Sequence, residues 1–342
     1  MSRSILVAAV LAYIAAMVGT TPAAPVPNTV PSDEQERLLA RSKKFIQQGK
    51  IDLYVILVAA LKLKPDDVRM WEPAADFGRK LIERAEMKDH HSKPLGTPSS
   101  YKDLATYLDR YKPEFKRLNE MYFRPDPSNA IPPIDFYKEA IQAPGVVDPT
   151  GIANCLILSR GSVQSGFGIQ SSVVFANGDM TARTIVWDAV IACDGDVTVG
   201  EHIHKCVIVA RGNITAKRGL SNVVLMAGGK VTLENKKTIK GEHLILENKP
   251  NTLGVVFFEL STVGVEVKVV EKSVEVSGVT AWKPCGKAGL KAGDVILEVS
   301  GKKPTDAESL RRLLRDALAL GDASVKLKRG NDTLTVKVSL PE

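Results

Sequence analysis

Apolar and polar positions follow two different periods along the chain. Between residues 33 and 123, apolar side chains recur every three to four positions, which is typical of helices with one buried face. Ser32–Gln35 supplies an N-cap for the first helix. These runs predict a helical domain over residues 28–123, and six prolines within 124–150 predict a linker. The predicted helices lie at Asp33–Ile46, Leu53–Leu63, Phe77–Ala85 and Tyr101–Phe123.

From residue 151 the pattern becomes an internal repeat of 17 residues, marked by Gly161, Gly178, Gly195, Gly212 and Gly229. An apolar triplet precedes each glycine, and the second residue after each glycine is again apolar. Such columns predict a β-solenoid over residues 151–250, whose turns stack about 4.8 Å apart. A glycine column marks a corner where φ is positive or a side chain has no room.

The solenoid has short rungs without long insertions. In this it resembles the bactofilin type of β-helix, which polymerises end to end in bacterial cell-shape proteins. The resemblance implies a rigid rod that can self-associate through its ends. The register breaks after Gly229, because Leu244–Leu246 arrives three residues late. We interpret this copy as the last, capping turn.

Alternating apolar residues at Val263–Val269 and Val274–Thr280 predict two strands in the last part of the chain. Between them and a helix over Ala307–Ala319 stands the run Ala-Gly-Leu, two residues, Gly-Asp-Val-Ile, at residues 288–296. Thr305 and Glu308 form a capping box for the helix, and Gly321 ends it. Two final strands, Ser324–Lys328 and Thr333–Leu340, are joined by a hairpin turn.

This order of motifs closely resembles the PDZ domains of the HtrA family, which implies a PDZ domain over residues 251–342. In such domains the free C-terminus of a partner adds a strand beside the first strand. The loop before that strand holds the carboxylate, the strand forms the floor of the groove and the helix forms its wall. Trp282 and Cys285 depart from the family's small residues. The peptide-binding residues implied here are Ser261, Thr262, Val263, Gly264, Val265, Val267, Ser309 and Leu313.

The chain opens with a basic Arg3 and an uncharged apolar run, Ile5–Val18, followed by small residues at Thr21–Ala24. The run is shorter than the ~20 residues of a membrane span, so residues 1–24 are predicted to be a signal peptide. An uncleaved N-terminal membrane anchor is the alternative. Either interpretation predicts an exported protein, located in the periplasm, the cell envelope or the medium.

Composition agrees with a folded protein, because 44% of residues are hydrophobic and 25% are charged. The net charge of +7 is spread along the chain, so nucleic acid is not an expected partner.

The repeat also decides the state of the cysteines. Cys155 and Cys206 share a column three turns apart, too far for a disulfide. Cys193 stands in a column of small residues, and Cys285 lies in the other predicted domain. All four cysteines are therefore predicted to be free and mostly buried.

Candidate chemistry is sparse. The chain contains no protease triad motif, nucleotide-binding loop or metalloprotease motif, so no catalytic residue, cofactor or metal site is predicted. His90–His91 is interpreted as a solvated loop, and His202, His204 and Cys206 as ordinary rung residues. Asp179, Asp194 and Asp196 lie near the glycine corner on adjacent turns, which leaves a glycan-acting or metal-binding solenoid as a minor alternative.

The fold class expected is therefore a multidomain α+β protein: an N-terminal helical segment, a central β-solenoid with 17-residue rungs and a C-terminal PDZ domain. The favoured function is a non-enzymatic exported scaffold, whose PDZ domain captures a partner's C-terminus or β-strand. The solenoid would serve as a rigid spacer or as an assembly platform. The alternative is a subunit that regulates an envelope protease or delivers clients to it.

Overall fold

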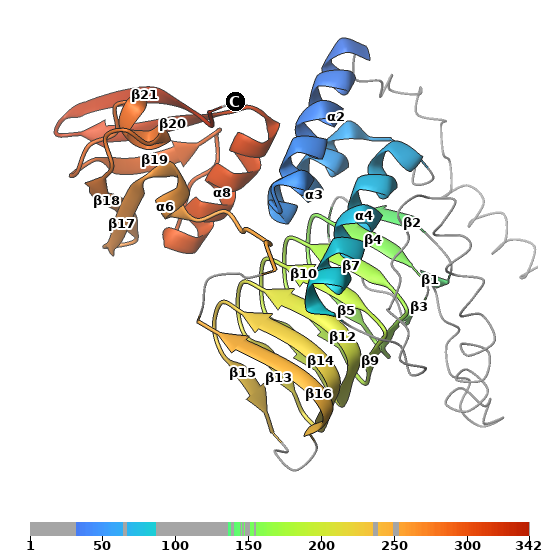
Figure 1. Cartoon of the computed structure of the whole chain (residues 1–342). Coiled ribbons are helices and arrows are strands. Elements are labelled where there is room, and N and C mark those ends of the chain that lie inside the picture. The colour runs from blue at the N-terminus through green and yellow to red at the C-terminus, as the bar shows by residue number, and fades with distance from the viewer. Residues whose placement is uncertain are drawn as a thin grey trace, which may run out of the picture.

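The computed structural model describes residues 32–63, 67–86, 136–137, 140–143, 145, 147, 151–153, 155–234, 239–248 and 253–341. The predicted signal peptide, the helix over 101–123 and the His90–His91 pair lie outside these residues. None of the described helices is long and apolar enough to cross a membrane. Helices, a β-solenoid and a C-terminal sheet domain follow one another along the chain, as the sequence predicts (Figure 1).

The solenoid consists of parallel strands stacked in three columns. Two columns belong to one bent 11-stranded sheet and the third is a separate five-stranded sheet. The separate sheet contains β5 (Val163–Ser165), β8 (Met180–Ala182), β11 (Val197–Val199), β13 (Ile214–Ala216) and β15 (Val231–Leu233). The first column of the bent sheet contains β1 (Phe136–Tyr137), β3 (Ile152–Ala153), β6 (Ile169–Gln170) and β9 (Val186–Trp187). The second contains β2 (Ala140–Ala143), β4 (Leu156–Ser159), β7 (Val173–Ala176) and β10 (Val190–Cys193). The long strands β12 (His202–Ala210), β14 (Gly219–Ala227) and β16 (Ile239–Glu247) run through both columns.

The 17-residue repeat is the register of this stacking. Val163 pairs with Met180, which pairs with Val197, and equivalent residues continue in the same way. One corner carries a side-chain ladder: Asp179 Oδ1 accepts from the N–H of Asp196, and Asp196 Oδ1 accepts from the N–H of Asn213. The glycines are required here because a Cβ on Gly212 would lie 2.1 Å from Asp196 Oδ1. The corner thus needs glycine to make room for the carboxylate of the preceding turn.

The solenoid begins earlier than the sequence indicates. β1 and β2 pair in parallel with β3 and β4, with an offset of 16 instead of 17: Ala140 lies beside Leu156. The prediction of a linker over 124–150 is therefore wrong for residues 136–137 and 140–143, which are strands of the solenoid. The one-residue change in spacing and the nearby prolines hide this turn in the sequence. At the other end, β16 joins three residues late, with Leu244 beside Val224, as predicted.

Three helices precede the solenoid in the chain: α2 (Ser32–Gln47), α3 (Ile51–Leu61) and α4 (Val68–Ala85). α4 lies over the strands of the solenoid (Figure 1). α3 is buried along nearly its whole length. It contacts β4 and β7 on one side and the last helix of the chain on the other (Figure 1). This cover explains the apolar triplets of the repeat. Leu156, Leu158 and Phe175 point outward from the solenoid and are buried beneath the helices, while Ile157 points into its interior.

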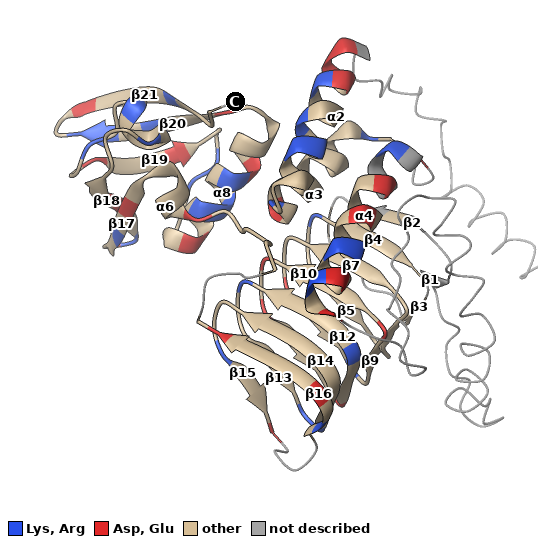
Figure 2. Cartoon of the chain, viewed as in Figure 1, with Lys and Arg blue, Asp and Glu red and all other residues tan. Residues whose placement is uncertain are grey.

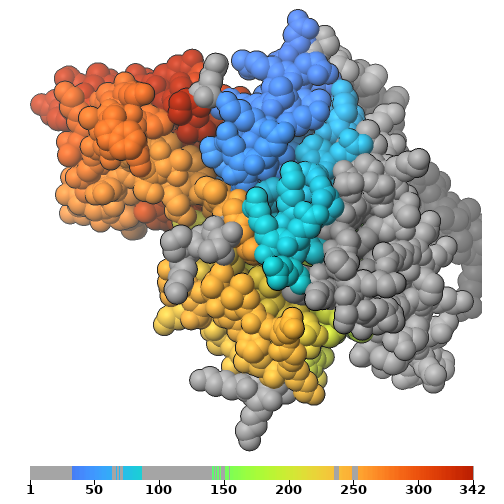
Figure 3. Space-filling view, in the orientation of Figure 1, coloured from blue at the N-terminus to red at the C-terminus, as the bar shows by residue number. Residues whose placement is uncertain are grey.

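The C-terminal domain projects beyond the other two parts (Figure 3). Its strands are β17 (Val265–Val270), β18 (Ser273–Val279), β19 (Val295–Val299), β20 (Asp322–Arg329) and β21 (Asp332–Ser339). Its helices are α6 (Leu260–Val263), α7 (Pro284–Lys287) and α8 (Ala307–Leu320). The predicted capping box is displaced by one position, because Asp306 is the extended N-cap and Ser309 its partner. Glu308 is thereby free of the cap and bonds elsewhere, as described below.

All four cysteines are free and buried, as the columns predict. Cys155, Cys193 and Cys206 lie in the core of the solenoid. Burial is the main cause that raises the pKa of Cys193 and of Cys285 to about 12. These thiols therefore act as small core residues rather than as nucleophiles.

Candidate functional site

The first strand of the C-terminal domain lies at the edge of its sheet. The strand order is β17-β18-β19-β20-β21, so β17 has one neighbouring strand among the described residues. An edge strand presents N–H and C=O groups with which an added strand can pair. Val269 and Val270, in the last part of β17, are 50% and 42% exposed. This edge can therefore receive an extended segment that carries apolar side chains.

A single turn of helix, α6, leads into β17 and ends at Gly264, whose φ is +76°. A Cβ at this position would lie 2.5 Å from the Cβ of Lys283 and 3.1 Å from that of Thr280. Both the backbone conformation and the close approach of the turn after β18 therefore require glycine. The N–H of Gly264 donates to the carbonyl oxygens of Leu260 and Ser261. A carboxylate bound here would share that donor with the loop itself.

Lys283 adds a positive charge to this loop, and the sequence analysis did not single it out. Its Nζ donates to the carbonyl oxygen of Ser261 over 2.5 Å and lies 5.3 Å from the centre of the Trp282 ring. Trp282 itself is 71% exposed. A ligand carboxylate bound at the loop would lie near this ammonium group, and their attraction would be modest because solvent screens exposed charges.

The predicted groove residues lie on or next to α6, β17 and α8. Ser261 and Thr262 are exposed in α6, Val263 and Val265 are buried, and Val267 is half-buried on β17. On α8, which contacts β17, Leu313 is half-buried against the core. The Ser309 hydroxyl instead accepts from the N–H groups of Thr305 and Asp306, within the cap of α8. The loop, the strand and the helix are thus brought together, with Ser309 serving the helix start.

Comparison with known proteins identifies this region. The PDZ domain family matches residues 261–340. Residues 261–340 are a PDZ domain. The serine protease Do-like HtrA of Bacillus subtilis (strain 168) is 31% identical over 86 residues, which are 25% of this chain and 19% of that protein. The chain thus spans about a fifth of the length of this curated relative, and the match includes the PDZ domain but not the protease domain.

A solved structure with a likeness to the chain is that of the HtrA3 PDZ domain bound to a phage-derived ligand, FGRWV. It is 23% identical, and the match covers 23% of this chain and 83% of that one, with a TM-score of 0.20. The resemblance to HtrA-type PDZ domains deduced from the motifs is confirmed by the family match and the curated relative.

The PDZ helix α8 turns its other side toward the solenoid, where it meets one column of the repeat. This column consists of the residues that precede the repeat glycines: Arg160, Asn177, Asp194, Arg211 and Gly228. The column carries both signs of charge, and on α8 the acidic Glu308 and Asp316 flank the basic Arg311 and Arg315. The rest of this solenoid face is largely uncharged (Figure 2). We call the four residues from Arg160 to Arg211 the charge column.

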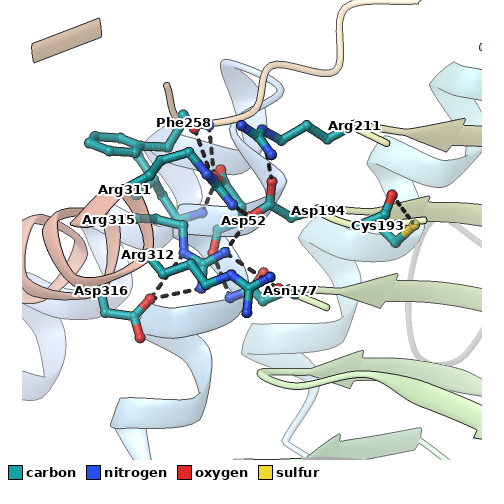
Figure 4. Close-up of polar contacts among 12 residues, drawn as sticks. Asp52, Asn177, Cys193, Asp194, Arg211, Phe258, Arg311, Arg312, Arg315 and Asp316 are labelled. Carbon is teal, nitrogen blue, oxygen red and sulfur yellow. Dashed lines mark hydrogen bonds and ion pairs between the residues drawn. The ribbon is translucent and has the colours of Figure 1, made fainter. Parts of the chain in front are cut away.

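Each residue of the charge column contacts α8, and Figure 4 shows the central part of this contact, around Asp194. Arg160 lies 3.4 Å from Asp316, and the carbonyl oxygen of Asn177 accepts from Arg315 over 3.4 Å. Asp194 accepts from Arg315 and, over 2.8 Å, from Arg311. Arg211 donates to Glu308 over 3.4 Å. The helix therefore runs along the stack of turns, in the direction opposite to the sequence order of the column.

Asp194 is the centre of this contact. Its side chain is 0% exposed, and those of Arg311 and Arg315 are 2% and 4% exposed. Burial raises the pKa of Asp194, opposed by the neighbouring guanidinium groups of Arg315 and Arg311. Burial lowers the pKa of Arg311, but its hydrogen bonds to Glu308 and Asp194 and the charges of these carboxylates raise it further, so the net shift is upward. Two arginines and one carboxylate in a dry interface fix one relative position of the PDZ domain and the solenoid.

The helical part contributes Asp52, on the first turn of α3. Its carboxylate accepts from the N–H of Phe258 over 2.7 Å and from that of Leu53 over 2.8 Å. Burial first, and then the nearby carboxylate of Asp194, raise the pKa of Asp52 to about 6. Asn177 also reaches this group, because its Nδ2 donates to the carbonyl oxygen of Asp52. Helices, solenoid and the chain segment entering the PDZ domain therefore meet at one buried polar cluster.

The acidic residues that suggested solenoid chemistry are not assembled into a site. Asp179 and Asp196 bond to backbone N–H groups of the next turn. Asp194 instead bonds to Arg311 of α8. In the part of the chain that the structure describes, no group of three or more His, Cys, Asp or Glu side chains could hold a metal ion. His204 stacks edge-on against Trp187, while Cys206 lies in the solenoid core.

Proposed function

We propose that the protein is a scaffold that captures an extended segment of a partner protein, ending in a free carboxylate, along the edge of β17. The observation that carries this proposal is the edge of β17, which pairs on one side only among the described residues and lies directly beside the fixed loop at Gly264. Backbone pairing would supply affinity, and Val267 and Leu313 would contact alternate side chains of the ligand. Lys283 would add an attraction for the terminal carboxylate.

The rest of the chain gives this capture site a defined position. Buried ion pairs and an apolar interface through α3 join the PDZ domain to the solenoid. The captured partner would therefore be held at a fixed distance and angle from a rigid rod. We further propose that the protein acts outside the cytoplasm, on the basis of the apolar run and small residues within 1–24. Self-association through the solenoid end that β15 and β16 form is part of the same proposal.

A client-delivery subunit for a separate protease is the second candidate. The curated relative that shares the PDZ domain is itself a serine protease, which supports a link to proteolysis. Peptide capture is common to both functions. They differ in whether a protease copurifies with the chain and whether captured proteins are then degraded.

The test is a titration of the full chain with a pool of peptides that each carry a free C-terminal carboxylate, and with the same peptides as amides. The pool includes Phe-Gly-Arg-Trp-Val, the sequence bound by the HtrA3 PDZ domain. We expect binding of some carboxylate peptides and at least about tenfold weaker binding of their amides, since a charge-assisted hydrogen bond contributes about 1.5–3 kcal/mol. Absence of binding to either form would refute capture at β17.

Gly264→Ala and Gly301→Ala form a matched pair for this titration. Both glycines have positive φ, at +76° and +81°, but a Cβ on Gly301 would meet no atom within 4 Å. Both variants carry the same kind of backbone strain, whereas Gly264→Ala alone displaces the loop against Lys283. We expect loss of peptide binding in Gly264→Ala only. Equal loss in both would show that strain in the domain, rather than the loop, controls binding.

A further inference from the structure

The loop and the helix that border the proposed groove are both tied to the same solenoid residue. Arg211 Nε donates to Glu259 Oε1 over 2.6 Å, and its Nη2 donates to Glu259 Oε2 over 3.0 Å. Its Nη1 donates to Glu308 Oε2 over 3.4 Å. Paired contacts of this kind fix the direction as well as the distance of a guanidinium group. One side chain from the solenoid therefore bridges two elements of the PDZ domain.

Glu259 is the residue that starts the loop helix. Its side chain accepts from the N–H of Thr262, and the Thr262 hydroxyl accepts from the N–H of Glu259 over 3.3 Å. α6 ends at Gly264, where β17 begins. A shift of the Glu259 carboxylate would thus be transmitted through one turn of helix to the loop that faces the ligand carboxylate.

Glu308 is the corresponding residue in the first turn of α8. It accepts from Arg311 over 2.8 Å and from Arg312 over 3.0 Å, in addition to Arg211. Arg311 in turn donates to Asp194. Two adjacent turns of the solenoid thereby hold the N-terminal half of the helix that forms the groove wall.

We propose that Arg211 and Asp194 are positioning residues for the peptide groove, so that docking of the PDZ domain on the solenoid and capture of a ligand strengthen each other. The proposal rests on the proposed function and adds its regulation. The spacing between α6 and α8 defines the mouth of the groove, and Arg211 fixes that spacing from outside the domain. A groove held in its binding geometry loses less freedom when a peptide binds. Because coupling between two sites is reciprocal, a bound peptide must also tighten the docked arrangement.

The test compares Arg211→Gln with Arg218→Gln in the full chain. Arg218 is a solenoid arginine that pairs with Glu201 over 3.5 Å, so its loss is matched in charge and size. The probe is the tightest carboxylate peptide of the pool, with its amide. We expect Arg211→Gln to weaken binding of the carboxylate form at least about fivefold, the lower end of usual coupling between sites. The amide should lose less, because the loop is what moves, and Arg218→Gln should bind as the wild type does.

Glu259→Gln and the double variant Arg211→Gln/Glu259→Gln complete the cycle. If Arg211 acts through Glu259, the double variant should lose no more affinity than the larger of the two single losses. Fully additive losses, or an unchanged affinity in Arg211→Gln, would overturn the proposal.

Hydrogen exchange of the unliganded full chain separates this proposal from peptide capture itself. We expect amides of residues 259–265 and 307–313 to exchange faster in Arg211→Gln than in Arg218→Gln, whether or not any peptide binds. Unchanged exchange in both segments would overturn the positioning role even if peptides bind well. Faster exchange in a chain that binds no peptide would refute peptide capture but would support the positioning role.

Discussion

Removal of the Asp194 carboxylate tests how the PDZ domain is held on the solenoid. In Asp194→Ala, Arg311 keeps Glu308 and the carbonyl oxygen of Phe258, and Arg315 keeps Asp316 and the carbonyl oxygen of Asn177. Each arginine nevertheless loses its one fully buried carboxylate partner among the described residues. Breaking a buried ion pair by removal of one partner costs about 3–5 kcal/mol. The remaining partners, and the end of repulsion with Asp52, place the expected loss near the lower figure, about 3 kcal/mol.

Two variants control for this interpretation. Asp316→Ala removes a carboxylate from the same contact that is 30% exposed, and should lower stability by about 0–1 kcal/mol because solvent screens such pairs. The triple variant Asp194→Leu/Arg311→Met/Arg315→Met removes the buried ion pairs of Asp194 together with both partners. It should recover most of the loss, since buried ion pairs replaced by apolar residues are often as stable.

The assay is native-state hydrogen exchange of the α8 segment, read as a local opening free energy, because a multidomain chain need not unfold in one step. An opening free energy for α8 within about 1 kcal/mol of the wild type in Asp194→Ala would refute the reasoning. So would a triple variant that is as unstable as the single one, since unpaired buried charge could then not be the cause.

Three further predictions concern other parts of the molecule. A carboxyl with a raised pKa stabilises the folded state below its ordinary pKa and loses this effect as pH rises through about 6. Asp52→Asn should therefore lower the free energy of unfolding less at pH 7 than at pH 4, by about 1–3 kcal/mol, as measured by urea unfolding. An equal loss at both pH values would contradict this. Gly212→Ala should lower the free energy of unfolding by about 1–3 kcal/mol through its clash with Asp196, and Gly145→Ala, with no atom within 4 Å, should not. The four buried cysteines should react with a thiol reagent only after unfolding; fast reaction of the native protein would show that the solenoid core opens.

The parts of the fold that could be predicted are those in which a local pattern recurs with the same residue types at the same spacing. The glycine and apolar columns repeat at 17 residues, so the strands and their register follow directly. The first turn was missed because its offset is 16 and its sequence is rich in proline. The cap of α8 was displaced by one residue because Thr305 and Asp306 are both good N-caps, and only the backbone shows which one is extended.

The helical cover of the solenoid also has a signal in the sequence. A strand with one solvated face alternates apolar and polar residues, as Val197–Val199 does. The triplets such as Leu156–Leu158 are apolar throughout, which is typical of strands buried on both faces. A second layer over this face could therefore have been inferred. Which segment supplies it depends on tertiary packing that no local pattern contains.

The charge column shows why the interface was harder to predict than the fold. Within the repeat, the position before each glycine varies in charge, and a position that varies looks unimportant when only similarity is sought. Its meaning depends on α8, more than 90 residues away from Arg211 in the chain. Three turns of solenoid span about 14 Å, and the helix from Glu308 to Asp316 spans about 12 Å. The charge column and this part of α8 therefore have similar lengths, and residues of opposite charge meet in order along them.

That match has a consequence for the proposed scaffold. Apolar contacts between α3 and its neighbours would permit α8 to slide by a turn, because one leucine fits much as another does. A slide by one solenoid turn would place Arg311, which now bonds to Asp194, beside Arg211, or would place Glu308, which now bonds to Arg211, beside Asp194. Like charges brought together in a buried contact are far more costly than an imperfect apolar contact, so the column favours one register. The direction in which the PDZ groove faces is therefore specified by residues of the solenoid, and in the proposed scaffold the solenoid would be part of the binding device as well as a spacer.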